Sequence, residues 1–98
     1  MKYIQYASGC RVVTSDAVAD EVIEYAAALA MSALADVVDI PSAAHRGPVR
    51  LLLGPAIPIS VVPAPDDTVQ PEDPGLVAEL QRRTAAVRAG IRSHELPF

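Results

Sequence analysis

The stretch at residues 49–62 constrains the fold of this chain more than any other part. Its sequence is VRLLLGPAIPISVV, in which only two side chains are polar. Gly54-Pro55 divides it into two short apolar runs, and short apolar runs bounded by turn residues are typical of buried strands. We therefore predict one strand over 49–53 and another over 57–62. Pro58 has no amide hydrogen, so that end lies at an edge or outside the ladder.

The residues before this stretch predict a hairpin followed by a helix. Residues 2–7 and 10–14 are β-favouring runs separated by Ser8-Gly9, which favours a two-residue hairpin turn. One bent strand with a bulge at the glycine is the alternative. Thr14-Ser15-Asp16 then offers side-chain oxygens for a helix N-cap. Apolar residues recur on one side of a helix over 16–34, with acidic residues on the other side.

Two further elements complete the predicted order. Residues 36–41 alternate in polarity and predict a strand that forms a hairpin with 49–53. Asp73-Pro74 marks the start of a helix over 74–89, since aspartate caps a helix and proline fits its first position. Gly90 suits the position just after the end of this helix, because glycine readily adopts the left-handed backbone that often closes a helix. We predict an α+β fold in the order ββαβββα, with an antiparallel sheet of four to five strands and two helices.

The length of 98 residues fits one small domain. We place this domain at 1–92 and include within it the proline- and acid-rich connection at 63–73, whose composition favours an extended, solvated chain. Residues 93–98 are expected to form a flexible C-terminal tail. Half of the residues are apolar and the charge is modest, which argues against intrinsic disorder.

Composition and charge limit the partners and the cellular compartment that we expect for the protein. The net charge is −4 and the pI is about 4.9, so the chain repels phosphate backbones and no nucleic-acid partner is expected. Cys10 is the only cysteine, which excludes an intramolecular disulfide and is compatible with a reducing cytoplasm. Seven arginines against one lysine, together with abundant alanine, indicate a GC-rich bacterial genome.

No membrane partner is expected either. The longest charge-free part of the alanine-rich segment, residues 25–35, is about half as long as a bilayer span. Residues 7–10 (ASGC) resemble a lipoprotein cleavage site. The residues before them are too few and too polar for the apolar core of a signal peptide. We therefore expect a cytoplasmic protein.

The best-placed polar pair for a ligand is His45-Arg46, in the predicted loop between two strands. An imidazole and a guanidinium on a loop can bind a carboxylate or a phosphate, although a hairpin loop also needs polar residues simply for solvation. Cys10 would need a base to act as a nucleophile, and nothing in the sequence places His45 or His94 beside it. Isolated histidines and scattered acids show no metal-ligand spacing. We therefore predict no catalytic residue, no metal and no cofactor.

Charged residues on both predicted helices are expected to form solvated outer faces. The arginines of the second helix offer a basic surface only if they gather in one stripe, and the periodicity divides them between two flanks. The acids of the first helix point to water, whereas catalytic carboxylate pairs need burial or a cleft. These residues are Arg82, Arg83, Arg88 and Arg92 on the second helix and Asp20, Glu21 and Glu24 on the first.

The strands of the central stretch raise a different expectation, because apolar residues occupy both of their faces. Two helices cover one face of a small sheet, and they cover both only by dividing across it. A second copy of the chain would cover the remaining face, most simply as a two-fold homodimer. The residues we assign to this interface are Leu51, Leu53, Ile59 and Val61.

Three functions fit these features. The first is a non-catalytic oligomeric or protein-interaction module, which binds a second copy or an unknown protein. The alternative is a small-molecule-binding domain for an anionic ligand, with His45 and Arg46 near the pocket. A third is an enzyme whose active site is shared across a dimer interface and uses Cys10 or His45.

Overall fold

The computed structural model describes residues 1–7, 9–43, 47–64 and 72–90. They confirm the predicted α+β class and the order ββαβββα. The predicted tail at 93–98 and most of the connection at 63–73 lie outside the described residues. The elements are β1 (Lys2–Tyr6), β2 (Cys10–Thr14), α1 (Asp16–Met31), β3 (Asp36–Ile40), β4 (Val49–Leu53), β5 (Ile59–Pro63) and α2 (Pro74–Arg88).

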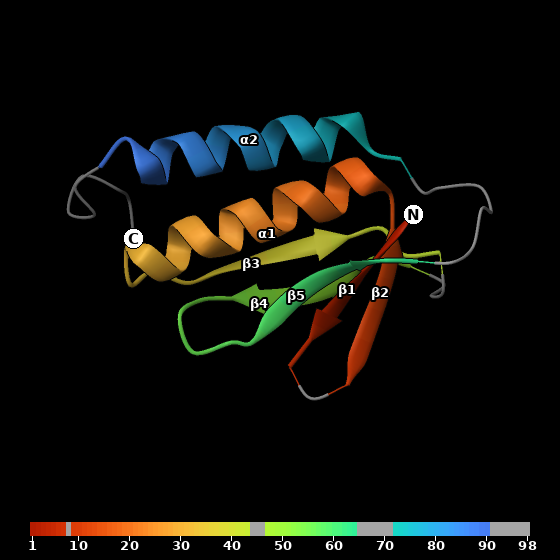
Figure 1. Ribbon diagram of the computed structural model, residues 1–98. Coiled ribbons are helices and arrows are strands. Elements are labelled where there is room, and N and C mark those ends of the chain that lie inside the picture. Colours follow the sequence, from red (N-terminus) through yellow and green to blue (C-terminus); the bar gives the residue numbers. More distant parts are fainter. Residues whose placement is uncertain (8, 44–46, 65–71, 91–98) are drawn as a thin grey trace.

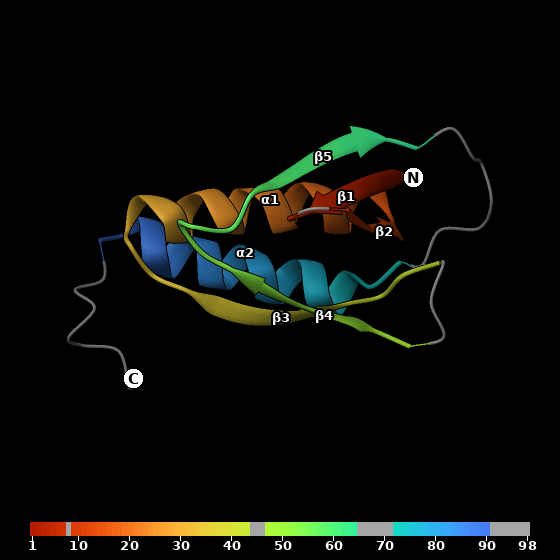
Figure 2. The same cartoon turned by 90° about the horizontal axis from the view of Figure 1, so that it is seen from below.

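The molecule has two layers, with both helices on one side of the strands (Figure 1). The helices lie side by side and run in the same direction, so that their N-termini are at the same end (Figure 1, Figure 2). Each begins at the predicted cap: Ser15 Oγ accepts from the Val18 amide at 3.2 Å, and Asp73 Oδ1 accepts from the Leu76 amide at 3.0 Å. These bonds satisfy amides that a helix start leaves free.

The first helix is shorter than predicted, because it ends at Met31 and not near residue 34. Ala33 adopts a left-handed backbone with φ 55°, and the Leu34 amide donates to the Leu29 carbonyl at 2.9 Å. This closing pattern usually has glycine at the left-handed position. An alanine there gave no sequence signal for the helix end.

The strands form two antiparallel sheets and not the single sheet that we predicted. One has the order β2-β1-β5 and the other pairs β3 with β4. The Tyr6 hydroxyl takes the place of a ladder strand at the edge of β4: it donates to the Leu52 carbonyl at 2.7 Å and accepts from the Leu52 amide at 3.2 Å. A second link between the sheets runs from the Ala43 amide to the Val13 carbonyl. The Tyr6 hydroxyl therefore occupies the Leu52 amide and carbonyl, which a neighbouring strand would need in a continuous sheet.

Both predicted hairpins are confirmed. In the first, Tyr6 pairs with Cys10, so three residues form the loop and not two, with Ala7 at φ 52°. In the second, β3 pairs with β4 over their full lengths. Strand β5 begins at Ile59, so Pro58 lies at the strand end as expected, where its carbonyl still accepts from the Ala7 amide at 2.8 Å.

The core lies between the helix layer and the strands. Its largest fully buried side chains come from both layers, so each layer depends on the other for its apolar surface. They are Ile4 and Val12 of the three-stranded sheet, Ile40, Leu51 and Leu53 of the hairpin, and Val18, Val22, Leu29 and Leu80 of the helices.

Candidate functional site

The predicted ligand residues His45 and Arg46 lie outside the described residues. The same holds for His94, so neither the ligand prediction nor the shared-active-site hypothesis is tested by the fold. Cys10 is exposed at the start of β2.

The predicted interface residues face inward. Leu51 and Leu53 are 2% and 0% exposed, and Ile59 and Val61 are half-buried against the core. Exposure on β4 alternates strictly, although its residues are nearly all apolar. A partner docking on this strand would therefore meet Arg50 and Leu52, and not the residues that we assigned.

The outer face of the β3–β4 hairpin carries one apolar pair and one charged pair. Val37 and Leu52 are cross-strand neighbours and remain 46% and 45% exposed. Asp39 and Arg50 are the next outward pair, with Nε of Arg50 at 2.9 Å from Oδ1 of Asp39. This hydrogen bond lowers the pKa of Asp39. The four side chains therefore form a small surface with an apolar pair at one end and a charged pair at the other.

The outer face of the three-stranded sheet also has an apolar row. Tyr3 is paired with Val13 on one side and Val62 on the other, and Ile4 next to it points into the core. The row must therefore point away from the helices. The Arg11 guanidinium lies 5.2 Å from the centre of the Tyr3 ring, a cation–π contact on the same face.

A groove of about 700 Å³ lies on the other side of the molecule, between the helices and the start of β3. The second half of α1, the turn into β3 and one face of α2 form its walls. Along the helix axes, one end of its lining is charged and the other end is apolar; we call these the charged level and the apolar level. The lining residues that matter below are Tyr25, Leu29, Leu34, Asp36, Arg83 and Val87.

A hydrogen-bonded network joins three elements at the charged level of this groove. The Tyr25 hydroxyl donates to Oδ2 of Asp36 at 2.5 Å, and Nη1 of Arg83 donates to the same oxygen at 3.0 Å. Nε of Arg83 also donates to Glu79 at 2.7 Å, and Arg82 pairs with Glu79 as well. Burial, together with the Asp36 hydrogen bond and charge, raises the pKa of Tyr25 to about 12. The network holds the Arg83 guanidinium in a defined position.

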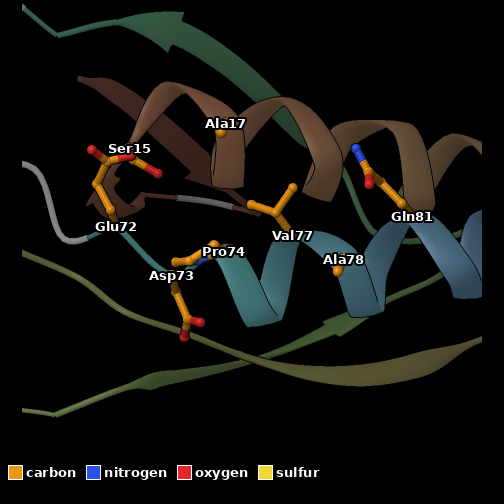
Figure 3. Close-up of a pocket in the computed structure, with 8 residues that line it drawn as sticks. All are labelled: Ser15, Ala17, Glu72, Asp73, Pro74, Val77, Ala78 and Gln81. Carbon is orange, nitrogen blue, oxygen red and sulfur yellow. The ribbon is translucent and has the colours of Figure 1, made fainter.

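A smaller pocket of about 410 Å³ lies where the two helices begin (Figure 3). Val77 points from α2 toward α1 in this view, and Glu72 and Asp73 lie at the helix start. Ser15 and Asp73 already cap the two helices, and both residues that precede Pro74 are acidic. These charges oppose the binding of an anion that paired helix N-termini would otherwise favour.

The remaining charged helix residues are paired across the surface. Asp20 accepts from Lys2 at 2.7 Å, which raises the pKa of that lysine, and Glu24 accepts from Arg88 at 2.5 Å. Glu21 accepts from Gln81 at 3.4 Å. These pairs hold α1 against β1 and α2. Glu21 and Glu24 line the same pocket, but neither side chain is buried, and acid–base catalysis requires a carboxylate pair in a buried cleft.

The fold and its surfaces together define a two-layer α+β domain with an uncovered strand face and an interhelical groove. Comparison with protein-family models, with curated proteins and with solved structures found no match. Among the described residues, no three His, Cys, Asp or Glu side chains gather closely enough to hold a metal ion. No helix in the described part of the chain is long and apolar enough to cross a membrane.

Proposed function

We propose that this protein is a non-catalytic interaction module that forms a homodimer through the outer face of its strand layer. The exposed Val37–Leu52 pair carries the proposal. Both helices lie on the opposite side of the strands (Figure 2), so no described element covers this pair. Large apolar side chains that are neighbours on an uncovered sheet face are typical of an interaction surface.

The arrangement of the four outward side chains favours a second copy as the partner. Consider a two-fold axis that lies between the two stacked hairpins, runs parallel to the strands and passes midway between β3 and β4. Rotation about it places β3 of one protomer over β4 of the other, with no shift along the strands. It sets Val37 opposite the partner's Leu52 and Asp39 opposite the partner's Arg50. Each protomer then supplies both members of every contact, as a two-fold interface requires. Two aligned sheets pack face to face in this way.

Pairing of two β3 edges is a less favourable way to make the dimer. That edge contains Asp36 and Asp39 in a strand of five residues. Two copies side by side would bring four carboxylates to one seam, and edge charges of this kind oppose strand addition. Face-to-face packing instead sets each Asp39 opposite an Arg50, while Asp36 stays bonded to Arg83 of its own chain.

The contact should extend beyond the hairpin. Four side chains a protomer fall well short of the roughly 20–30 residues a side of a standard interface. The outward row of Tyr3, Val13 and Val62 on the neighbouring sheet is a second apolar surface of the strand layer. Even so the area is modest, and we expect a dissociation constant on the order of micromolar.

Light scattering after size exclusion tests this proposal, over a concentration series that spans the micromolar range. The wild type should approach twice the chain mass of 10.3 kDa as its concentration rises. Leu52→Asp should remain a monomer, because it places a carboxylate in the centre of the apolar contact. Met31→Asp is the matched control, since Met31 is 89% exposed at the end of α1 and away from the strand face. A wild type that stays monomeric at all concentrations refutes the proposal, and so does a Leu52→Asp variant that dimerises like Met31→Asp.

A further inference from the structure

We propose that the groove between α1, α2 and the start of β3 binds a small amphipathic carboxylate, such as a short fatty acid. Its head group would lie on the guanidinium groups of Arg82 and Arg83, and its chain on Leu29, Leu34 and Val87. This site lies on the helix side of the molecule and is independent of the proposed dimer. It also does not involve His45 or Arg46.

The groove has the size and lining of a small-molecule site. Its volume of about 700 Å³ falls within the range of roughly 300–1,000 Å³ that is usual for ligand pockets. Leu29 is buried at its floor, and Leu34 and Val87 are half-buried in its walls. A mostly apolar lining with a few fixed polar groups is the usual composition of such pockets.

The polar and apolar parts of the groove are separated along the helices. Arg83 precedes Val87 by four residues on α2, and Tyr25 precedes Leu29 by four residues on α1. Because the helices run in the same direction, both steps lead from the charged level to the apolar level (Figure 1). Four residues correspond to about 6 Å along a helix. A ligand that spans both levels therefore has a charged head and an apolar chain of a few carbon atoms.

The hydrogen-bonding groups left over at the charged level favour an anion. Oδ2 of Asp36 already accepts from Tyr25 and Arg83, and Oδ1 accepts from the Val37 amide at 2.8 Å. The Arg83 guanidinium uses Nε and Nη1 in hydrogen bonds to Glu79 and Asp36, and it also interacts with the Tyr25 hydroxyl. The unused groups are therefore mostly N–H donors on two arginines. A guanidinium presents such donors as a fork that fits a carboxylate.

The existing network prepares Arg83 for this role. Its side chain is held by carboxylates from two elements, Glu79 on α2 and Asp36 at the start of β3. A ligand would therefore meet an ordered guanidinium and would not lose the entropy of fixing a free one. Arg82 is more exposed and shares Glu79, which makes it the adaptable member of the pair.

Titration with hexanoate, followed by ¹H–¹⁵N NMR, tests this site. The amides of residues 34–36 and 83–87 should shift, with a dissociation constant of about 1 mM for a ligand of this size. Hexylammonium has the same number of carbon atoms and the opposite charge, and it should cause much smaller shifts. Equal binding of hexylammonium, shifts confined to other surfaces, or no shift with hexanoate at tens of millimolar would each overturn the proposal.

Two variants separate the head-group contact from the apolar contact. Arg82→Gln/Arg83→Gln should weaken hexanoate binding about tenfold or more, because it removes both charged forks. Arg88→Gln is the matched control, since Arg88 lies on the same helix and pairs with Glu24 outside the groove. Ala86→Phe keeps both arginines but fills the groove, and it should also abolish binding. Unchanged affinity in either groove variant, with its NMR spectrum otherwise native, would refute the assignment.

Discussion

Replacing Tyr25 with phenylalanine removes one hydroxyl group from the network that joins α1, α2 and β3. The Tyr25 hydroxyl donates to Oδ2 of Asp36 at 2.5 Å. A hydrogen bond to a charged group contributes about 1.5–3 kcal/mol to stability. The Asp36 side chain is 36% exposed and keeps its bonds from Arg83 and from the Val37 amide, so the lower end applies. We expect Tyr25→Phe to lower the free energy of unfolding by about 1.5 kcal/mol at pH 7.

This difference should depend on pH in a defined direction. Burial and the bond to Asp36 raise the pKa of Tyr25 from 10.0 to about 12 in the folded protein. Between these two values the unfolded chain loses the tyrosine proton before the folded chain does, so the stability of the wild type falls as pH rises. A difference of two pKa units corresponds to at most about 2.7 kcal/mol, and solvent screening reduces it. Between pH 10 and 12 the wild type should therefore lose most of its advantage over Tyr25→Phe.

Urea unfolding of both proteins at pH 7, 10, 11 and 12 measures this effect. Comparing the two proteins cancels the contribution of every titrating group that they share. Tyr3→Phe is the control, because no hydrogen bond from the Tyr3 hydroxyl is found among the described residues and its stability should stay within about 0.5 kcal/mol of wild type. The reasoning is refuted if Tyr25→Phe is as stable as wild type at pH 7, or if the difference between them is the same at pH 12 as at pH 7.

Three further changes test other parts of the structure. Ala33→Gly should stabilise the protein by about 0.5–1 kcal/mol in urea unfolding, since the left-handed φ of 55° is unfavourable for alanine, and a loss of stability would contradict this helix ending. Thr84→Val should leave thermal stability unchanged or raise it by up to about 1 kcal/mol, because the buried hydroxyl has no hydrogen-bond partner in the described structure, and a clear loss would mean that it has one. Asp39→Arg/Arg50→Asp should dimerise with itself but not with wild type, because mixed dimers would place like charges opposite each other; free exchange of subunits, seen by native mass spectrometry, would contradict the proposed two-fold arrangement.

Local signals predicted most of the elements. The side-chain oxygens of Ser15 and Asp73 marked the two helix starts, because capping depends only on residues within one turn. The loop residues around Gly9 likewise marked the first hairpin. The end of α1 was missed for the same physical reason: its left-handed residue is Ala33, and alanine has no preference for that conformation.

The division of the strands into two sheets could not be read from the sequence. It depends on Tyr6 and Leu52, which are 46 residues apart and meet only in the folded chain. The run 49–53 also misled the interface prediction, because four of its five residues are apolar and leucines lie on both of its faces. Arg50 was the sequence signal for the outward face, and in the fold Leu52 shares that face while Leu51 and Leu53 point inward.

The candidate groove also depends on contacts between residues that are far apart in the sequence. Periodicity placed Arg83 outside the apolar arc of α2, which suggested a solvated residue. The structure brings it to Asp36, 47 residues away, at the start of a strand that packs beneath the helices. A charged residue at a strand end and another on a helix face carry no pairing signal that a single sequence reveals.

The most direct test of the proposed dimer is an isotope-filtered NOE experiment on a mixed sample of labelled and unlabelled protein. It detects only contacts between protomers. The proposed arrangement predicts cross-peaks between the methyl groups of Leu52 in one protomer and those of the partner's Val37. Intermolecular cross-peaks that arise only from other surfaces, or none at concentrations well above micromolar, would contradict it.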